Sequence, residues 1–137
     1  MAIENSQTTT PHPFAYLKGE QFILLKTFRK SGEALATPVW FVEDQGKLYI
    51  TTVQNIGKVK RIRNNGRVLL APCNRSGAVH GTEIEARGRE LPAAEQPAAQ
   101  KLLALKYGFL FKVIAFISKL RKTQQTIIEI QPMQSQA

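Results

Sequence analysis

The chain has 137 residues, 43% of them hydrophobic, which suits one globular domain with a real core and excludes a disordered segment. Its net charge of +9 at pH 7 implies an anionic partner. The single cysteine, Cys73, excludes an intrachain disulfide, and no apolar run reaches the roughly 20 residues that cross a bilayer. Residues 1–12 are polar and show no signal-peptide pattern, so we expect a soluble cytoplasmic protein without a membrane partner.

The first part of the chain predicts a polar arm followed by strands. Residues 1–13 are interpreted as the arm, and residues 15–20 as a short helical turn. Three segments rich in β-branched and aromatic residues then predict strands: 22–29, 34–42 and 47–53. The sequence EDQG before the third strand predicts a hairpin in which Gly46 takes a positive φ.

The densest block of positive charge follows the third predicted strand. Residues 45–82 contain no acid and seven cations, and five of these fall within eleven residues: Lys58, Lys60, Arg61, Arg63 and Arg67. Val59 and Ile62 are three residues apart and can share one helical face, with the cations around them. The stretch 56–64 therefore predicts a short amphipathic helix that ends near Asn65-Gly66. Its negative partner could be nucleic acid, a membrane or a cofactor phosphate.

The rest of the chain predicts two strands, a helical region and a last strand. Residues 67–73 read as a strand, and residues 82–91 as a half-exposed strand with Ile84, Ala86 and Gly88 on one face. Further along, an Ala- and Leu-rich segment predicts a helix, in which Pro97 marks either a kink or the true start. The remaining segments predict a second apolar-faced helix, a final strand and a tail: 109–122, 123–132 and 133–137.

Together these elements predict one mostly β domain over residues 14–132, with helices attached to an antiparallel barrel of six strands. Four stretches then resemble a known family, in its order and near its spacings: LLKTFRKSGEALATPVWFVEDQGKLYITT, GKVKRIRNNGRVLLAPC, GTEIEARGREL and KYG. This is the pyridoxamine 5'-phosphate oxidase-like split-barrel family of flavin and deazaflavin proteins, and residues 15–131 resemble above all its branch that uses coenzyme F420.

The resemblance implies a six-stranded split barrel that forms a homodimer, with FMN or F420 in a cleft between the subunits and a small-molecule substrate beside it. By position, Lys58 matches the family's phosphate-binding lysine. The parent oxidases carry Ser-Arg-Lys here, whereas this chain has Ile56-Gly57-Lys58, so the arginine is missing and Lys60 or Arg61 would have to compensate. A strand that ends in hydroxyls and leads into Gly57 at a helix start also suits a phosphate on physical grounds.

The resemblance also implies which residues border the cofactor ring and its tail. The ring would lie against the edge of the second strand and the end of the third: Thr37, Pro38, Val39, Trp40, Thr51 and Thr52. Pro38 removes a ladder donor and marks an edge or a split, while Trp40 is interpreted mainly as a core residue. The glutamate tail of F420 would meet cations: Arg61, Arg63 and Arg75.

Other chemically suggestive residues predict no catalytic or metal site. Glu83 and Glu85 share a strand face, where like charges usually face solvent or pair with arginine. His12 and His80 lack neighbours at ligand spacing, and Cys73 is interpreted as a small buried residue.

Three functions follow for this sequence. The leading one is an oxidoreductase that passes hydride between FMN or F420 and a small unsaturated substrate, because such chemistry asks little of side chains. The second is a carrier or sensor that binds flavin or haem without catalysis. The third is a basic nucleic-acid-binding module, which the lack of aromatic residues within the basic run disfavours.

Overall fold

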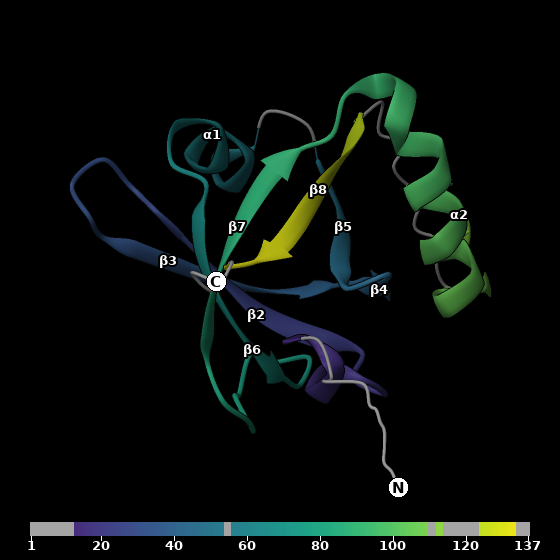
Figure 1. The fold of residues 1–137 in the computed structure, drawn as a ribbon, viewed down its shortest axis with the longest axis horizontal. Helices are drawn as coiled ribbons and strands as arrows, with labels where there is room; N and C mark the ends of the chain where they lie inside the picture. The colour runs from purple at the N-terminus through teal and green to yellow at the C-terminus, as the bar shows by residue number, and fades with distance from the viewer. Residues whose placement is uncertain (1–12, 54–55, 110–111, 114–123, 134–137) are drawn as a thin grey trace, which may run out of the picture.

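The computed structural model describes residues 13–53, 56–109, 112–113 and 124–133. These residues form a seven-stranded antiparallel sheet in the order β3-β2-β6-β7-β8-β5-β4 (Figure 1). The strands are β2 (Phe22–Phe28), β3 (Ala34–Trp40), β4 (Val42–Asp44), β5 (Lys47–Val53), β6 (Arg67–Cys73), β7 (Ile84–Glu90) and β8 (Gln125–Pro132). The helices are η1 (Ala15–Leu17), α1 (Gly57–Asn64), η2 (Ala93–Glu95) and α2 (Gln96–Tyr107).

The sheet curls because its two edge strands are consecutive in the chain. β3 lies at one edge and β4 at the other, and only Phe41 separates them. The predicted second strand over 34–42 is therefore broken at Phe41, which corrects the expected six strands to seven. The predicted split barrel itself is confirmed.

Most of the predicted strands and helices occur at the residues where the local sequence pattern predicts them. The strand over 67–73 is β6, and the helix predicted over 56–64 is α1. Gln45 and Gly46 have φ values of 53° and 82°, so they form the two-residue turn between β4 and β5 that the sequence predicted. Ala86 and Gly88 on β7 are buried, while the charged residues that alternate with them, Glu85, Arg87 and Arg89, are exposed, which confirms the half-exposed strand.

The Ala- and Leu-rich segment forms α2, and Pro97 lies in its first turn, so this proline marks the start of the helix and not a kink. The helix stands on the outer side of the sheet near β4, β5 and β8 (Figure 1). The second predicted helix, over 109–122, lies largely outside the described residues, as do nearly all of the predicted arm and tail.

Two clusters of buried apolar side chains hold these elements together. The larger fills the curled sheet and includes Val59 and Ile62, which fasten α1 to the barrel. The smaller lies between α2 and the sheet and contains Leu103, Tyr107 and Ile127. The barrel thus has α1 at one end and α2 along one side, and the two helices carry different chemistry.

Candidate functional site

The cations of helix α1 surround two apolar side chains that anchor the helix to the barrel. Val59 is fully buried and Ile62 is 3% exposed, and both face the barrel. The backbone N–H groups of Val59 and Lys60 donate to the carbonyl of Ile56, at 3.0 and 3.1 Å. The N–H groups of Gly57 and Lys58 have no acceptor within the described part of the chain. Two free donors therefore lie beside the basic side chains, as an anion site requires.

Lys58 is half-buried, and its ammonium contacts no acid in the described ranges. Burial lowers the pKa of Lys58, and the nearby charge of Arg61 lowers it further. A partly desolvated cation beside a like charge is unfavourable unless an anion compensates it. The position of Lys58 therefore suits a phosphate supplied from outside the chain.

Arg61 lies next to Lys58 and is held in a defined orientation. Its Nε donates to the hydroxyl of Thr27 on β2 at 2.6 Å, and the Thr27 side chain is almost fully buried. Burial lowers the pKa of Arg61, as does the charge of Arg29. An added Cβ at Gly57 would approach Nη1 of Arg61 to 2.8 Å, so the guanidinium lies across this glycine. The two predicted phosphate ligands, Lys58 and Arg61, thus converge at the start of α1.

Two other cations of the same stretch are neutralised within the chain. Arg63 contacts a carboxylate oxygen of Glu90 through Nε at 2.8 Å and Nη2 at 2.7 Å. Arg67 contacts Glu85 at 3.0 Å. Arg63 was predicted to meet the glutamate tail of F420, but its guanidinium already binds an acid of β7.

The predicted ring-contacting residues of β3 point to two different faces. Thr37 on β3 lies opposite Leu25 on β2, and Leu35 on β3 lies opposite Thr27 on β2. Thr37 and Thr27 therefore share one face of the sheet as diagonal neighbours. Val39, on the same face, is buried in the barrel core. Trp40 stacks on Tyr107 beneath α2, with ring centroids 4.5 Å apart. Of these residues, Thr37 is the one that lies partly exposed on the face that carries Thr27.

Pro38 is exposed, opposite Leu24 at the sheet edge, as a strand proline requires. The hydroxyls at the end of β5 are likewise split between faces. Thr52 is 9% exposed and faces inward, whereas Thr51 faces outward and its Oγ1 lies 3.3 Å from Oε1 of Gln125. Both precede α1 in the chain, so they lie at the end of the barrel that carries the basic residues.

Arg75 lies at the other end of the barrel. It follows Cys73, which pairs with Phe22 at the start of β2, whereas Arg61 contacts Thr27 near the end of that strand. Five strand residues separate these positions, or roughly 17 Å. Within one chain, Arg75 therefore lies far from the phosphate that Lys58 would hold, and its contact with the glutamate tail of F420 stays a prediction.

The remaining suggestive residues have ordinary partners. Glu83 forms an ion pair with Lys26 at 2.7 Å and Glu85 with Arg67, so the two carboxylates are separately neutralised by cations of neighbouring strands. His80 contacts Glu20 at 2.8 Å. Cys73 is 2% exposed, which confirms its interpretation as a buried residue, and burial raises the pKa of its thiol. No three His, Cys, Asp or Glu side chains of the described residues could hold a metal ion together.

Sequence reasoning missed a polar clamp on the break between β3 and β4. The hydroxyl of Tyr107 accepts a hydrogen bond from the Phe41 N–H at 2.8 Å and donates to the Phe41 carbonyl at 2.6 Å. Lys106 donates to the carbonyls of Phe41 and Glu20, at 2.8 and 2.9 Å. Burial lowers the pKa of Lys106 to about 8 and raises that of Tyr107 to about 12. The sequence KYG was noticed only for its resemblance, because nothing local assigns its partners.

An open pocket of about 620 Å³ borders this clamp, between η1, the break and α2. Its lining is largely apolar and includes Phe14, Leu17, Phe41, Leu102 and Leu105, with Lys106 at its edge. It lies away from α1, so it belongs to a different part of the molecule from the basic residues.

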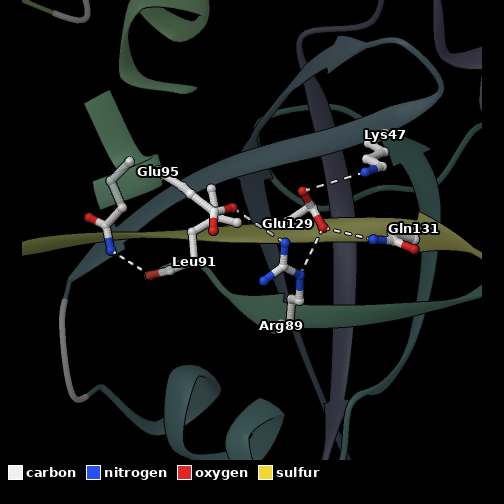
Figure 2. Close-up of polar contacts among 7 residues, drawn as sticks. Lys47, Arg89, Leu91, Glu95, Glu129 and Gln131 are labelled. Carbon is white, nitrogen blue, oxygen red and sulfur yellow. Dashed lines mark hydrogen bonds and ion pairs between the residues drawn. The ribbon is translucent and has the colours of Figure 1, made fainter. Parts of the chain in front are cut away.

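A second missed cluster surrounds Glu129, which is only 3% exposed (Figure 2). Arg89 and Gln131 donate to its Oε1 at 2.9 and 2.8 Å, and the Lys47 ammonium lies 4.0 Å from Oε2. Burial alone would raise the pKa of Glu129, but these hydrogen bonds and charges hold it below its usual value. The one sequence signal was an acid inside the apolar run of β8, which implies a compensating cation.

Comparison with known proteins relates this chain to a family. A family model described as pyridoxamine 5'-phosphate oxidase matches residues 10–136. None of the curated proteins matches the chain. In the described residues no helix has the length and hydropathy needed to span a bilayer.

Solved structures with a similar fold differ in what they are described to do. One is HutZ, the haem storage protein of Vibrio cholerae, with a TM-score of 0.66 and 13% identity over 88% of this chain and 87% of that one. An FAD-binding protein of Mesorhizobium loti has a TM-score of 0.59 and 16% identity over 86% and 85% of the two chains. A structure described as a domain-swapped dimer has a TM-score of 0.57 and 18% identity over 81% and 80%.

At these identities the structures establish the fold, whereas the family model covers nearly the whole chain. Its match includes β2, β3 and α1, on which Thr27, Thr37, Lys58 and Arg61 lie. The chain belongs to the pyridoxamine 5'-phosphate oxidase family.

Proposed function

We propose that this protein is an oxidoreductase that binds a phosphorylated flavin or deazaflavin, FMN or F420, with the phosphate at the start of α1. The observation that carries the proposal is the pair of cations, Lys58 and Arg61, which lie together without an acidic partner in the described residues. The free N–H groups of Gly57 and Lys58 add two further donors. These groups fit a phosphate, which accepts charge-assisted hydrogen bonds from several directions.

The ring of the cofactor would supply the chemistry, because it accepts and gives the hydride. The chain would position the cofactor and exclude water around it. In this assignment Lys58 and Arg61 hold the phosphate, and Thr37 and Thr52, which both face inward, lie on the way to the ring. Arg63 already pairs with Glu90, which leaves fewer cations for a glutamate tail and favours FMN over F420.

The first test compares cofactors with and without the phosphate. Titration of the protein with FMN and with riboflavin, followed by flavin fluorescence, should show tighter binding of FMN. Lys58→Ala should weaken FMN binding by about 1–3 kcal/mol, because it removes a charge-assisted hydrogen bond, and should leave riboflavin binding unchanged. Lys60→Ala is the matched control, since Lys60 is an exposed cation on the same helix and should change FMN binding by less than about threefold.

Equal FMN affinity in wild type and Lys58→Ala would rule out this phosphate site. A parallel titration with F420 decides between the cofactors, and we expect FMN to bind more tightly. Hydride transfer is then tested by reducing the loaded protein and following its reoxidation by quinone-like acceptors.

A second candidate function is a cofactor carrier without catalysis. The observation that favours it is the similarity of fold to a haem storage protein. Haem titration followed by absorbance distinguishes the two candidates. Tight haem binding together with no FMN binding would replace our proposal by this one.

A further inference from the structure

We propose that Thr27 is a positioning residue for the phosphate site, acting by holding the Arg61 guanidinium across Gly57 beside Lys58. This inference rests on the proposed function, because it names the residue that orients one of the two cations of that site. In this arrangement Thr27 would not contact the phosphate, and Gly57 would contact it only through its backbone N–H. They determine where the guanidinium of Arg61 lies.

The hydrogen bond between Arg61 and Thr27 restricts a side chain that would otherwise be mobile. Arg61 Nε donates to Thr27 Oγ1 at 2.6 Å, and the Thr27 side chain is 1% exposed within β2. A buried side chain on a strand has little freedom to move. The bond uses Nε, so the two terminal nitrogens remain available as donors to a second partner.

Gly57 provides the space that this orientation needs. A side chain at position 57 would begin 2.8 Å from Nη1 of Arg61 and 3.7 Å from its Cζ. Arg61 is four residues further along the helix, and helical side chains lean toward the N-terminus, so its guanidinium reaches back over the first turn. An arginine one turn away thus occupies the space beside Lys58 that a side chain at position 57 would fill.

The charges around this position explain why a fixed geometry is needed. Lys58 and Arg61 repel one another, and Arg29 at the end of β2 adds to the repulsion on Arg61. Without the hydroxyl of Thr27, the guanidinium would move away from the other cations into water. The hydrogen bond therefore keeps two like charges together before an anion arrives, and this preorganisation favours tight binding.

The test uses substitutions that separate the hydroxyl from the shape of the side chain. Thr27→Val keeps the shape and removes Oγ1, and should weaken FMN binding about tenfold while riboflavin binding stays unchanged. Thr27→Ser keeps Oγ1 and should bind FMN as the wild type does. If Thr27 had only a structural role, Thr27→Val would weaken the binding of FMN and of riboflavin equally, and that result would overturn the proposal.

Gly57→Ala provides a second test of the position of the Arg61 guanidinium, and it leaves Thr27 unchanged. The new methyl group should displace the guanidinium and weaken FMN binding about tenfold, whereas the melting temperature should stay the same or rise because alanine favours helix. In an Arg61→Ala background, neither Thr27→Val nor Gly57→Ala should weaken FMN binding further. Full FMN affinity in Gly57→Ala, or additive effects in that background, would contradict the proposal.

Inorganic pyrophosphate distinguishes failure of this inference from failure of the proposed function. Pyrophosphate should raise the melting temperature of the wild type, and by less in Thr27→Val than in Thr27→Ser. If pyrophosphate stabilises the wild type, and stabilises Thr27→Ser more than Thr27→Val, but the wild type binds no FMN, then the proposed cofactor is wrong and the role of Thr27 stands. If FMN binds with dependence on Lys58 but all Thr27 variants respond alike, the role of Thr27 is wrong and the proposed function stands.

Discussion

At the scale of single residues, cations of one basic stretch have different fates. Arg63 and Arg67 pair with acids of β7, while Lys58 and Arg61 meet each other. The sequence identified the stretch but could not assign the acidic partners of Arg63 and Arg67, because Glu85 and Glu90 lie well beyond it in the chain. Their positions opposite Arg67 and Arg63 depend on how β6, β7 and α1 pack.

Tyr107 is the residue for which the structure makes the clearest stability prediction. Tyr107→Phe removes the hydroxyl that accepts the N–H of Phe41, a residue that is 1% exposed, whereas the Phe41 carbonyl keeps Lys106 as a donor. The unsatisfied buried N–H should lower the free energy of unfolding by about 1–3 kcal/mol, measured by urea denaturation. Tyr16→Phe is the control, since the exposed Tyr16 hydroxyl donates to a single carbonyl, that of Thr82, and its loss should cost much less.

The same substitution has a defined dependence on pH. Burial raises the pKa of Tyr107 from its ordinary 10.0 to about 12. Between these values the unfolded chain loses the proton that the folded chain keeps, so wild-type stability should fall as pH rises through this window. Tyr107→Phe should lack this part of the alkaline fall. Equal alkaline curves for both proteins would show that the hydroxyl is not buried as described.

At the scale of elements, the seating of α1 depends on close backbone approach between β6 and β7. The Gly88 N–H donates to the Gly66 carbonyl at 2.7 Å. A Cβ added at Gly66 would lie 2.9 Å from the carbonyl oxygen of Gly88, which is backbone and cannot easily move. Because Gly66 joins α1 to β6, this contact helps determine where α1 lies.

Gly66→Ala should therefore destabilise the protein by about 1–3 kcal/mol, the usual effect of overpacking, and should weaken FMN binding by shifting α1. Thermal denaturation and FMN titration measure the two effects. Gly88→Ala is the matched control, since its Cβ would meet Ile128, Val68 and Ile62 at ordinary distances of 3.5–3.7 Å. Should Gly66→Ala prove no more harmful than Gly88→Ala, the close approach does not seat α1.

At the scale of the whole molecule, large apolar side chains are exposed around the C-terminal end of α2. Leu105 on α2 is 83% exposed, and Phe109, two residues beyond its end, is 76% exposed. Exposed apolar groups of this size often mark contacts between proteins. The family resemblance of the sequence implies a homodimer with its cofactor between the subunits, and this implication stays a prediction.

Sedimentation velocity should then give twice the chain mass of 15.3 kDa at micromolar concentration. If the cofactor lies between subunits, FMN should strengthen dimerisation, because a ligand that binds only the dimer shifts the equilibrium toward it. Lys58→Ala should dimerise without this response to FMN. A monomer that binds FMN with full affinity would contradict the shared site.

The amino-acid sequence was sufficient for the positions of most strands and of α2, the turn at Gln45-Gly46 and the helix that carries Lys58. These follow from local patterns, since alternation, helical spacing and turn residues act between near neighbours in the chain. The resemblance of four short stretches was also sufficient to indicate the family.

Long-range contacts could not be read in this way. Arg61 and Thr27 are 34 residues apart and Tyr107 and Phe41 are 66 apart, and no local pattern links them. The same holds for the break at Phe41 and for the cations around Glu129. Such contacts depend on which strands pair and on how the sheet curls until its two edges meet. Both bring together side chains whose separation in the chain carries no information about their partners.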